Sequence, residues 1–410
     1  MDGFNMIKNR IANKVLVSGD VVTIDPRHCN GSWIVDIEGK RYLDCFAQYG
    51  SHALGWNHPE MLDIQYKLGE MAIQKLANPE ILTEEYAEFV DEFSKITPDF
   101  KHHFYIDGGT LGVENALKVA FDWKYDQIKT EDLDVIHFVG AFHGRSGYTL
   151  SLTNNPYSDL KVKHFPKFNW TRVVNPAINV YDNVEEIEQQ AINQILQACQ
   201  KGNVAALILE PIQGEGGDNH FRPEFFKELR KLADEQNFLL ILDEVQTGVG
   251  MTGKMWGYEN YDIVPDLISF GKKTQVCGCA STERVDSVND NVFKTPYRIS
   301  STWGGNIVDM VRAAKIFQII QEENLVKNAE VVGNYLLENL KSLGLRKVRG
   351  KGLFVAFDLK DTEERNNLHK RLKEEMFVLT CGEKSIRFRP HLTFSKTDVD
   401  VAIDVIKRKL

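Results

Sequence analysis

Short apolar runs alternate with helix-like stretches between about residues 100 and 275. The runs HHFYI, DVIHFVG, VAALILE, FLLILD and DLISF are each followed by a polar or glycine-rich turn, and stretches such as DGGTLGVENALKVAFDWK and RPEFFKELRKLADEQN lie among them. Most runs are rich in Val, Ile and Leu and do not alternate with polar residues, which is typical of strands covered on both faces. The pattern predicts an α/β fold whose mostly parallel central sheet is covered by helices.

The two ends of the chain carry a different pattern. Near the C-terminus, GKGLFVAFDLK, LHKRLKEEMFVLTC and DVDVAIDVIKRKL indicate strand, helix, strand and helix, and GSWIVDIEGKRYLD has strand-like pieces near the N-terminus. We expect these segments to form a smaller α+β domain from residues 1–44 and 306–410, beside a large domain of residues 45–305.

Each apolar run of the middle region ends in polar residues or glycines. These ends are Asp107–Gly109, His143–Arg145, Glu210, Asp243–Glu244 and Gly271–Lys272. In open parallel sheets, ligands bind outside the carboxyl ends of the strands. The sequence therefore predicts one charged crevice at this edge of the sheet.

Composition and charge exclude several classes of function. The chain has 410 residues, a net charge of -9 and a pI of about 5.7, so we expect no nucleic-acid partner. No apolar run approaches the roughly 20 residues of a membrane helix, and we expect no membrane association. Asn, Lys and Arg interrupt the first residues, MDGFNMIKNRIANKVLVSGD, so no signal-peptide core is present and we expect a cytoplasmic protein.

The six cysteines do not indicate a metal site. They form no C-x-x-C pair, and no Cys/His cluster has the spacing of zinc ligands. We interpret them as small buried apolar residues and predict no metal.

A lysine pair, Lys272 and Lys273, directly follows the run DLISF and a glycine. Burial lowers the pKa of a lysine, and a desolvated lysine is suited to forming an imine with a carbonyl compound. If that carbonyl is pyridoxal phosphate, a carboxylate must keep the ring nitrogen protonated, and Asp243 at the end of FLLILD is a candidate. An ion-pair or helix-cap role for Asp243 is the structural alternative.

The same cofactor would also need a phosphate site and two residues that cover its ring. The glycine turn with Gly109 and Thr110 begins a predicted helix, and helix N-termini bind phosphate well. Phe142 and Val245 follow two other strands and could cover the ring faces. Thr110 as a simple helix cap and Phe142 as a core residue remain the structural alternatives.

A competing motif is GVGMTG (Gly248–Gly253), which matches the dinucleotide fingerprint G-x-G-x-x-G. The first glycine should directly follow a strand, whereas DEVQT intervenes, and KMWGYENYDIVPD after it is a poor long helix. We therefore regard a nicotinamide-dependent dehydrogenase as a weak alternative.

Over nearly its whole length the chain resembles the class III aminotransferases, which use pyridoxal phosphate on a type I fold. The segments that carry the resemblance are GGTLGVENALK, AFHGRSGYTLSLTN, EPIQGEGGDNHFRPEFF, DEVQTGVGMTGKMWGYE, PDLISFGKKTQVCG, STWGGN and KSIRFRP. The resemblance implies that Lys272 is the Schiff-base lysine. Lys273 would then point the other way, because successive side chains alternate at a strand end, and we interpret it as a structural or surface cation.

The resemblance also assigns the other cofactor contacts. It places Asp243 at the ring nitrogen and Gln246 at the phenolic oxygen. The remaining contacts would be Phe142 and Val245 on the ring faces, Gly109 and Thr110 at the phosphate, and Thr302 reaching the phosphate from a partner subunit. This last role implies a homodimer with shared active sites.

Within the class, GRSGYTLSLTN, GKKTQVCG and STWGGN are most similar to the lysine 6-aminotransferases (lysine ε-aminotransferases). The implied reaction belongs to lysine catabolism and moves the ε-amino group of L-lysine to 2-oxoglutarate. Its products are L-glutamate and 2-aminoadipate 6-semialdehyde, which cyclises to a piperideine carboxylate. The alternative is an ω-aminotransferase acting on 4-aminobutyrate, ornithine or another ω-amine.

Four residues are implied to handle the substrates. Arg145 would bind the carboxylate far from the reacting carbon, and Arg387 the carboxylate next to it. Glu215 would cover Arg387 while lysine is bound and move away for glutamate. Gly50 would line the substrate channel from the partner subunit.

Overall fold

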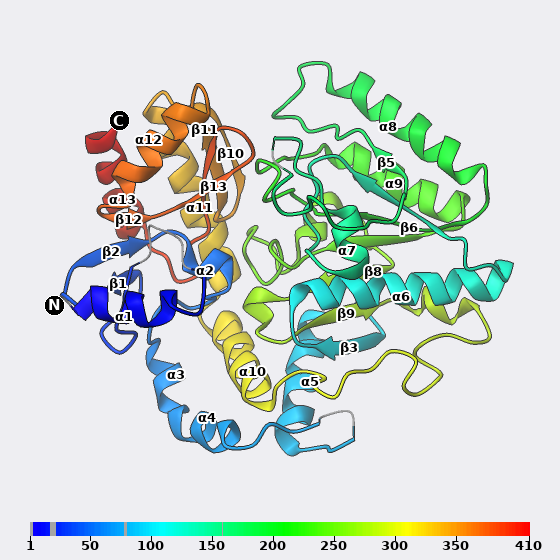
Figure 1. The fold of residues 1–410 in the computed structure, drawn as a ribbon, viewed down its shortest axis with the longest axis horizontal. Helices are drawn as coiled ribbons and strands as arrows, with labels where there is room; N and C mark the ends of the chain where they lie inside the picture. The colour runs from blue at the N-terminus through cyan, green and yellow to red at the C-terminus, as the bar shows by residue number, and fades with distance from the viewer. Residues whose placement is uncertain (1–2, 17–21, 78–79, 158) are drawn as a thin grey trace.

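A central sheet of seven strands forms the larger part of the fold (Figure 1). The structure is a computed structural model that describes residues 3–16, 22–77, 80–157 and 159–410. The strand order is β3-β9-β8-β7-β6-β4-β5, and β5, β4, β6, β7 and β8 are mutually parallel along that order. Only β9 runs antiparallel to both of its neighbours, β8 and β3. The predicted α/β fold with a mostly parallel sheet is confirmed. The bounds of these strands are β3 (His102–Ile106), β4 (Asp134–Phe138), β5 (Arg172–Val173), β6 (Val204–Leu209), β7 (Leu239–Asp243), β8 (Leu267–Phe270) and β9 (Cys277–Ser281).

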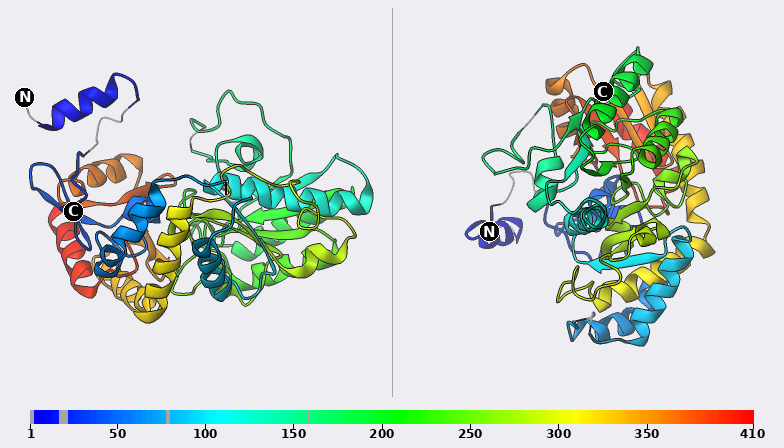
Figure 2. Two further views of the ribbon diagram at one scale, coloured as in Figure 1. Left: turned by 90° about the horizontal axis from the view of Figure 1, so that it is seen from below. Right: turned by 90° about the vertical axis from the view of Figure 1, so that its right-hand side faces the viewer.

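The inner strands are buried on both faces, as their apolar runs predict. Alternate residues of β7 enter different apolar clusters: Leu240 faces the cluster that includes helix α9, whereas Ile241 faces the cluster that includes α6. Because successive side chains of a strand point to opposite faces, a continuous run of apolar residues is what such a strand requires. Figure 2 shows helices on both sides of the sheet.

The helices between and around the strands have the following bounds. They are α1 (Gly3–Ala12), α2 (Ala47–Gly50), α3 (Pro59–Asp63), α4 (Gln65–Ala72), α5 (Glu84–Ile96), α6 (Gly109–Ile128), α7 (Gly147–Leu152), α8 (Val184–Cys199), α9 (Pro223–Glu235), α10 (Ile307–Glu322), α11 (Leu325–Ser342), α12 (Thr362–Leu372) and α13 (Lys396–Lys409). Three short 3₁₀ helices are η1 (Gly257–Tyr261), η2 (Lys272–Thr274) and η3 (Glu283–Ser287). None of the helices in the described ranges combines the length and apolar character that crossing a bilayer would need.

Two smaller sheets bring the ends of the chain together. One has the order β1-β2-β12, in which β12 from the C-terminal segment lies parallel to β2 from the N-terminal segment. The other is antiparallel with the order β10-β11-β14-β13. Their bounds are β1 (Trp33–Val35), β2 (Arg41–Asp44), β10 (Arg346–Lys351), β11 (Phe354–Asp358), β12 (Met376–Phe377), β13 (Leu379–Cys381) and β14 (Ser385–Phe388). The boundaries 45–305 for the large domain, and 1–44 with 306–410 for the small one, stay a prediction.

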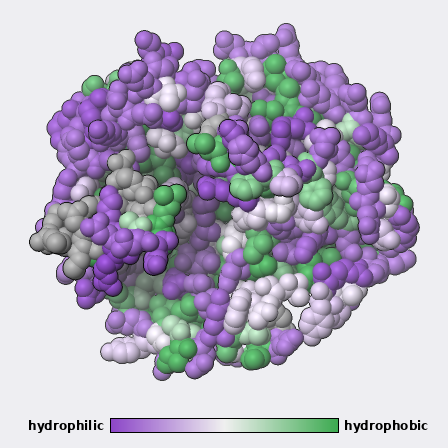
Figure 3. Space-filling model, in the orientation of Figure 1, coloured by the Kyte–Doolittle hydropathy of each residue, from purple (hydrophilic) through white to green (hydrophobic). Residues whose placement is uncertain are grey.

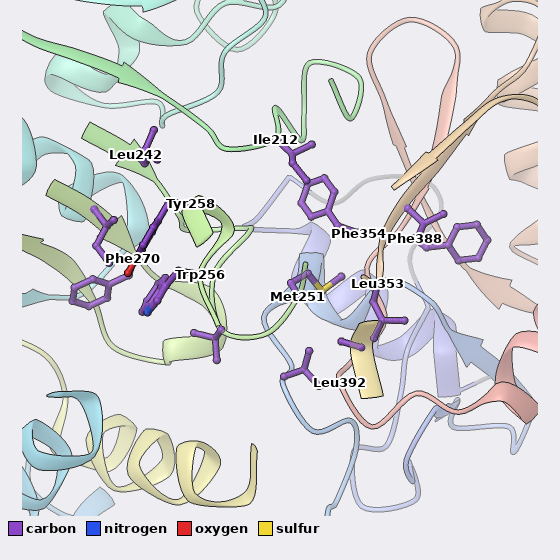
Figure 4. Packing of buried hydrophobic residues seen from close by; sticks show 14 of the residues in the cluster. Ile212, Leu242, Met251, Trp256, Tyr258, Phe270, Leu353, Phe354, Phe388 and Leu392 are labelled. Atoms are coloured by element: carbon purple, nitrogen blue, oxygen red, sulfur yellow. The ribbon is translucent and has the colours of Figure 1, made fainter. Parts of the chain in front are cut away.

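One continuous apolar core joins the large sheet to the small ones. Met251, which follows β7, belongs to the same cluster as Leu353 and Phe388 of the C-terminal segment. Figure 4 shows Met251 beside Leu353, and the amide of Leu353 donates a hydrogen bond to the carbonyl oxygen of Met251 at 3.0 Å. The relative positions of the large and small sheets are therefore fixed by packing.

The GVGMTG motif lies at this junction and not at a helix start. Val249, Gly250 and Gly253 have positive φ values of 56, 81 and 79°, and a Cβ at position 253 would lie 3.0 Å from the side chain of Glu330 in α11. The residues that follow form the short η1 and no long helix. The glycines serve turns and close packing here, so the context that a dinucleotide fingerprint requires is missing from this stretch.

A buried lysine fastens the N-terminal segment to the large sheet. Lys273 Nζ donates to the carbonyl oxygens of Gly50 at 3.1 Å and Gln246 at 3.3 Å, and the side chain is only 1% exposed. The bend that it holds contains four consecutive residues with positive φ, 47–50, three of which are not glycine. Such backbone persists only when its surroundings fix it, and Lys273 is one of those fixing contacts. The surface alternative for Lys273 is wrong.

Replacing Gly112 of α6 by Ala tests the close approach of α6 to β9. A Cβ there would lie 2.6 Å from the carbonyl oxygen of Gly278, so helix and strand must separate, and we expect a loss of about 1–3 kcal/mol in the free energy of unfolding. Gly69→Ala in α4 is the matched control, because nothing lies within 4 Å of its Cβ position and Ala favours helix by up to about 1 kcal/mol. In thermal unfolding, the melting temperature of G112A should lie below that of wild type, and that of G69A should equal or exceed it. Equal melting temperatures for G112A and wild type would contradict this packing.

Replacing Lys273 by Met tests the burial of its charge. Burial, with the nearby charges of Lys272 and Arg389, lowers the pKa of Lys273 to about 7. In the unfolded chain a lysine has a pKa of about 10.4. Between about pH 7 and 10 the unfolded chain therefore binds more protons at this group than the folded protein does. The free energy of unfolding of wild type should then increase by up to about 1.4 kcal/mol per pH unit over this range. Met cannot titrate, and the stability of wild type relative to K273M should therefore increase across this range. Melting temperatures measured at several pH values check this; a constant difference between the two proteins would show that Lys273 keeps its proton.

Candidate active site

A cleft of about 1210 Å³ opens at the carboxyl ends of the parallel strands. It is closed on the other side by residues of the N-terminal segment, among them Tyr49, and by the small antiparallel sheet. Ten of the predicted site residues line it: Gly109, Thr110, Phe142, Arg145, Glu215, Asp243, Val245, Gln246, Lys272 and Arg387. The face in Figure 3 is mostly hydrophilic, with apolar residues in small groups.

Lys272 follows β8 and begins η2 with a positive φ of 55°. Burial lowers the pKa of its ammonium group, although the charge of Asp243 acts in the opposite direction. The turn into η2 also separates the two lysines, because consecutive side chains of a 3₁₀ helix point about a third of a turn apart. Lys272 thus faces the cleft while Lys273 faces the N-terminal segment, and the cause is this helical turn and not the strand alternation expected from the sequence.

Asp243 ends β7 at the floor of the cleft and is 5% exposed. Its Oδ2 lies 2.8 Å from Nδ1 of His143, and its Oδ1 accepts hydrogen bonds from Ser269 Oγ at 3.0 Å and the amide of Val245 at 3.2 Å. These contacts hold the carboxylate in one orientation. The sequence placed His143 at a strand end but gave it no role, because only the fold brings it to Asp243.

The N-terminus of α6 opens into the same cleft. Gly108 caps this helix with a φ of 101° and no side-chain hydrogen bond, so the first amides of α6 are not occupied by a cap. A Cβ on Gly109 would lie 3.0 Å from Val245 Cγ1, so this position must stay small to leave room between helix and strand. Thr110 lies within the first turn, and the cap alternative for it is wrong.

These three features fit pyridoxal phosphate. A buried carboxylate lies at the floor, a lysine with a lowered pKa faces it, and helix amides open at the rim. The unpartnered helix start suits a phosphate, and Asp243 suits a protonated ring nitrogen.

A carboxylate and two cations form the second cluster in the cleft. Glu215 Oε2 accepts from Arg387 Nη2 at 2.9 Å, while its Oε1 pairs with Lys161 Nζ. Burial alone would raise the pKa of Glu215, but Arg387 and Lys161 outweigh it and hold this pKa below its ordinary value. Arg387 is 3% exposed, and its Nε has no hydrogen-bond partner among the described residues. Sequence reasoning missed Lys161, which stands outside every recognised segment.

Arg145 is the exposed cation of the cleft. Its guanidinium carbon lies 5.6 Å from the centre of the Phe142 ring, and Lys161 Nζ lies 5.1 Å from the same centre. Such contacts orient a cation without neutralising it, so Arg145 stays available for an anion.

Glu210 is a buried acid that the sequence placed at a strand end without a role. It accepts hydrogen bonds from the amides of Phe142 at 3.0 Å and Gly214 at 2.9 Å. Burial raises the pKa of Glu210 to about 7. It joins the loop that carries Phe142 to the loop that carries Glu215.

Gln246 is oriented by a buried ion pair behind the cleft. Its Oε1 accepts from Arg389 Nε at 3.2 Å, and Arg389 Nη2 pairs with Asp218 at 2.5 Å. Arg389 and Asp218 are both fully buried. Replacing one partner of such a pair would leave an uncompensated buried charge.

Gly50 and Thr302 do not line this cleft. Gly50 accepts the hydrogen bond from Lys273, and Thr302 lies exposed on the surface. Their expected roles involve a partner subunit and stay predictions. No group of three or more His, Cys, Asp or Glu residues able to hold a metal occurs in the described ranges.

The chain is similar to a well-defined set of proteins. The profile of the family "Aminotransferase class-III" matches residues 16–410. The chain is 42% identical to the L-lysine-epsilon aminotransferase of Mycobacterium tuberculosis over 98% of this chain and 94% of the relative. It is 40% identical to the protein of that name from Amycolatopsis lactamdurans, over 98% and 95%. It is 34% identical to a 4-aminobutyrate aminotransferase from Kluyveromyces lactis, over 93% and 88%.

The fold is similar to that of a solved structure of the same kind. The structure described as lysine aminotransferase from M. tuberculosis in the internal aldimine form superimposes with a TM-score of 0.96, at 42% identity, and covers 99% of both chains. This chain belongs to the class III aminotransferases, which are pyridoxal phosphate enzymes with the type I fold.

Proposed function

We propose that this protein transfers the ε-amino group of L-lysine to 2-oxoglutarate. The products are L-glutamate and 2-aminoadipate 6-semialdehyde, which cyclises to a piperideine carboxylate. The observation that carries the proposal is the Glu215–Arg387 pair in a cleft that also contains the exposed Arg145. The identities of 40–42% to lysine ε-aminotransferases over 98% of the chain support it.

The two substrates pose different geometric demands. Lysine reacts at its terminal amine, so its carboxylate lies five carbons away, whereas glutamate has one carboxylate beside the reacting carbon and another at its far end. Arg145 suits the far carboxylate of both substrates, because a guanidinium can bind a carboxylate with two parallel hydrogen bonds. Arg387, near Lys272, suits the carboxylate that only glutamate and 2-oxoglutarate place there.

Glu215 resolves the conflict between these substrates. While lysine is bound, an uncovered Arg387 would repel the cationic amine of the substrate. Glu215 prevents this because it neutralises Arg387 through the 2.9 Å contact. When 2-oxoglutarate binds, its carboxylate replaces Glu215 on Arg387, so the buried guanidinium is never without an anion. This exchange lets one cleft accept both compounds.

The residues at the floor of the cleft would hold the cofactor and move protons. Bound pyridoxal phosphate would supply an electron sink for negative charge on the substrate carbon. Lys272 would remove the proton from the carbon that carries the amine and later return one, a task helped by its lowered pKa. Asp243, oriented by His143 and Ser269, would hold the ring nitrogen.

The remaining contacts follow from positions in the cleft. Gly109 and Thr110 would bind the phosphate, Phe142 and Val245 would cover the ring faces, and Gln246 would contact the phenolic oxygen. We propose in addition that Thr302 and Gly50 act across a homodimer, and that the protein is cytoplasmic and serves lysine catabolism. Trp303 beside Thr302, and Tyr49 beside Gly50, are exposed aromatic residues at 41% and 59%, which supports contact with a second subunit.

A second candidate is an aminotransferase for 4-aminobutyrate or another ω-amine such as ornithine. The 34% identity to a 4-aminobutyrate aminotransferase favours it. Its donors also carry the amine at one end and a carboxylate away from it, so Arg145 and Glu215 would serve them in the same way.

Replacing Lys272 by Ala tests the central residue. We expect turnover to fall by at least about 10³-fold, since a positioned acid–base group alone contributes about 10²–10⁴-fold. The visible absorption of the lysine-bound cofactor should disappear from the purified protein. The control is K273M, which should retain that absorption; if K272A retains both absorption and turnover, the role belongs to Lys273.

A panel of amine donors tests the substrate. With 2-oxoglutarate as acceptor, L-lysine should give the highest kcat/KM and 4-aminobutyrate and ornithine lower values, and the lysine product should form an adduct with 2-aminobenzaldehyde, which detects cyclic imines. Glutamate formation measured in parallel confirms the transfer. A higher kcat/KM for 4-aminobutyrate or ornithine would favour the second candidate.

A further inference from the structure

Lys161 is a third member of the Glu215–Arg387 cluster. It lies on a turn in the long connection between α7 and β5, where the amides of Val162 and Lys163 donate to the carbonyl oxygen of Asp159 at 2.9 and 2.8 Å. The turn directs Lys161 Nζ to Oε1 of Glu215. Lys161 also lines the cleft, so it is positioned to act on substrate binding.

The two cations hold different oxygens of the same carboxylate. Arg387 binds Oε2 of Glu215 and Lys161 binds Oε1. The side chains of Lys161 and Glu215 are 31% and 28% exposed, whereas that of Arg387 is 3% exposed. Glu215 can therefore release the buried Arg387 while it stays paired with Lys161 at the more open side of the cleft.

We propose that Lys161 is a positioning residue for the exchange at Arg387, which keeps Glu215 paired when a substrate carboxylate takes its place. The inference rests on the proposed function, because it concerns substrates that place a carboxylate beside the reacting carbon. Without Lys161, release of Arg387 would leave Glu215 without a cationic partner in a partly desolvated cleft, and breaking such a pair is costly. Lys161 thereby strengthens binding of 2-oxo acids.

The ring of Phe142 helps to hold Lys161 in place. Lys161 Nζ lies 5.1 Å from the ring centre, and Arg145 lies against the same ring at 5.6 Å. This arrangement raises a competing role for Lys161, which is direct contact with the far carboxylate that Arg145 is suited to bind. The two roles differ in the substrates that they affect.

The binding of 2-oxo acids to the holoenzyme distinguishes these two roles of Lys161. Without a transferable amino group the holoenzyme cannot react with 2-oxo acids, so their Kd can be measured by isothermal titration calorimetry. K161M should raise the Kd of 2-oxoglutarate, which has two carboxylates, and of pyruvate, which has only the one beside the carbonyl, by a similar factor of about 10, equivalent to about 1.4 kcal/mol. K161R should restore binding, and K163M, which removes an exposed lysine from the same turn, should match wild type.

A double substitution tests whether Lys161 acts through Glu215. In an E215Q background the carboxylate is absent, so adding K161M should change the Kd of 2-oxoglutarate by less than about twofold, within the scatter of independent sites. Single-turnover rates with L-lysine should change by less than about twofold in K161M, because Glu215 still covers Arg387 in that variant.

Three results would overturn the inference: an unchanged Kd in K161M, a loss confined to 2-oxoglutarate, or a full loss that persists in the E215Q background. The second of these would assign Lys161 to the far carboxylate. Rejection of lysine in the donor panel, together with the expected Kd changes, would instead overturn only the proposed donor.

Discussion

The site depends on a carboxylate that the fold buries almost completely at the floor of the cleft. Asp243 ends β7, between β6 and β8, and is 5% exposed. A carboxylate in such a place must be paired or hydrogen-bonded, and His143, Ser269 and the amide of Val245 provide those bonds. Because these groups lie on three different strand ends, the sheet itself holds the acid in register with Lys272. Lys272 directly follows Gly271 at the end of β8, so the same sheet also sets its place in the cleft.

Other charged residues around the cleft are also paired. Arg389 and Asp218 are fully buried together and orient Gln246, and Glu215 neutralises Arg387. Glu210 is bound by two backbone amides, and burial raises its pKa to about 7 although the charge of His143 acts in the opposite direction. The carboxylates of Asp243, Glu210 and Glu215 therefore each have partners that also fix their direction. This is how a charged site forms inside an otherwise apolar core.

The sequence predicted the strands and their functional ends because both depend on local pattern. A run such as FLLILD is typical of a covered strand, and its terminal Asp243 is then expected at the ligand-binding edge. His143 and Lys161 could not be assigned in this way, since their partners are 100 and 54 residues away in the sequence. Lys273 was misjudged in part, because a lysine after a strand gives no sign that backbone carbonyls will bury it. The contacts that position the site are long-range, and only the chain topology reveals them.

The shared core between the large and small sheets has a consequence for motion. Met251 and Leu353 pack in one cluster that spans both, and displacing the sheets as rigid bodies would open cavities, which costs about 24 cal/mol for each Å³. The proposed exchange of carboxylates at Arg387 would thus be left to rotations of single side chains. Partly exposed side chains rotate in picoseconds to nanoseconds, far faster than the turnover of about 10 per second that is typical of enzymes. Rotation of the side chains in the proposed exchange would therefore not limit the catalytic cycle.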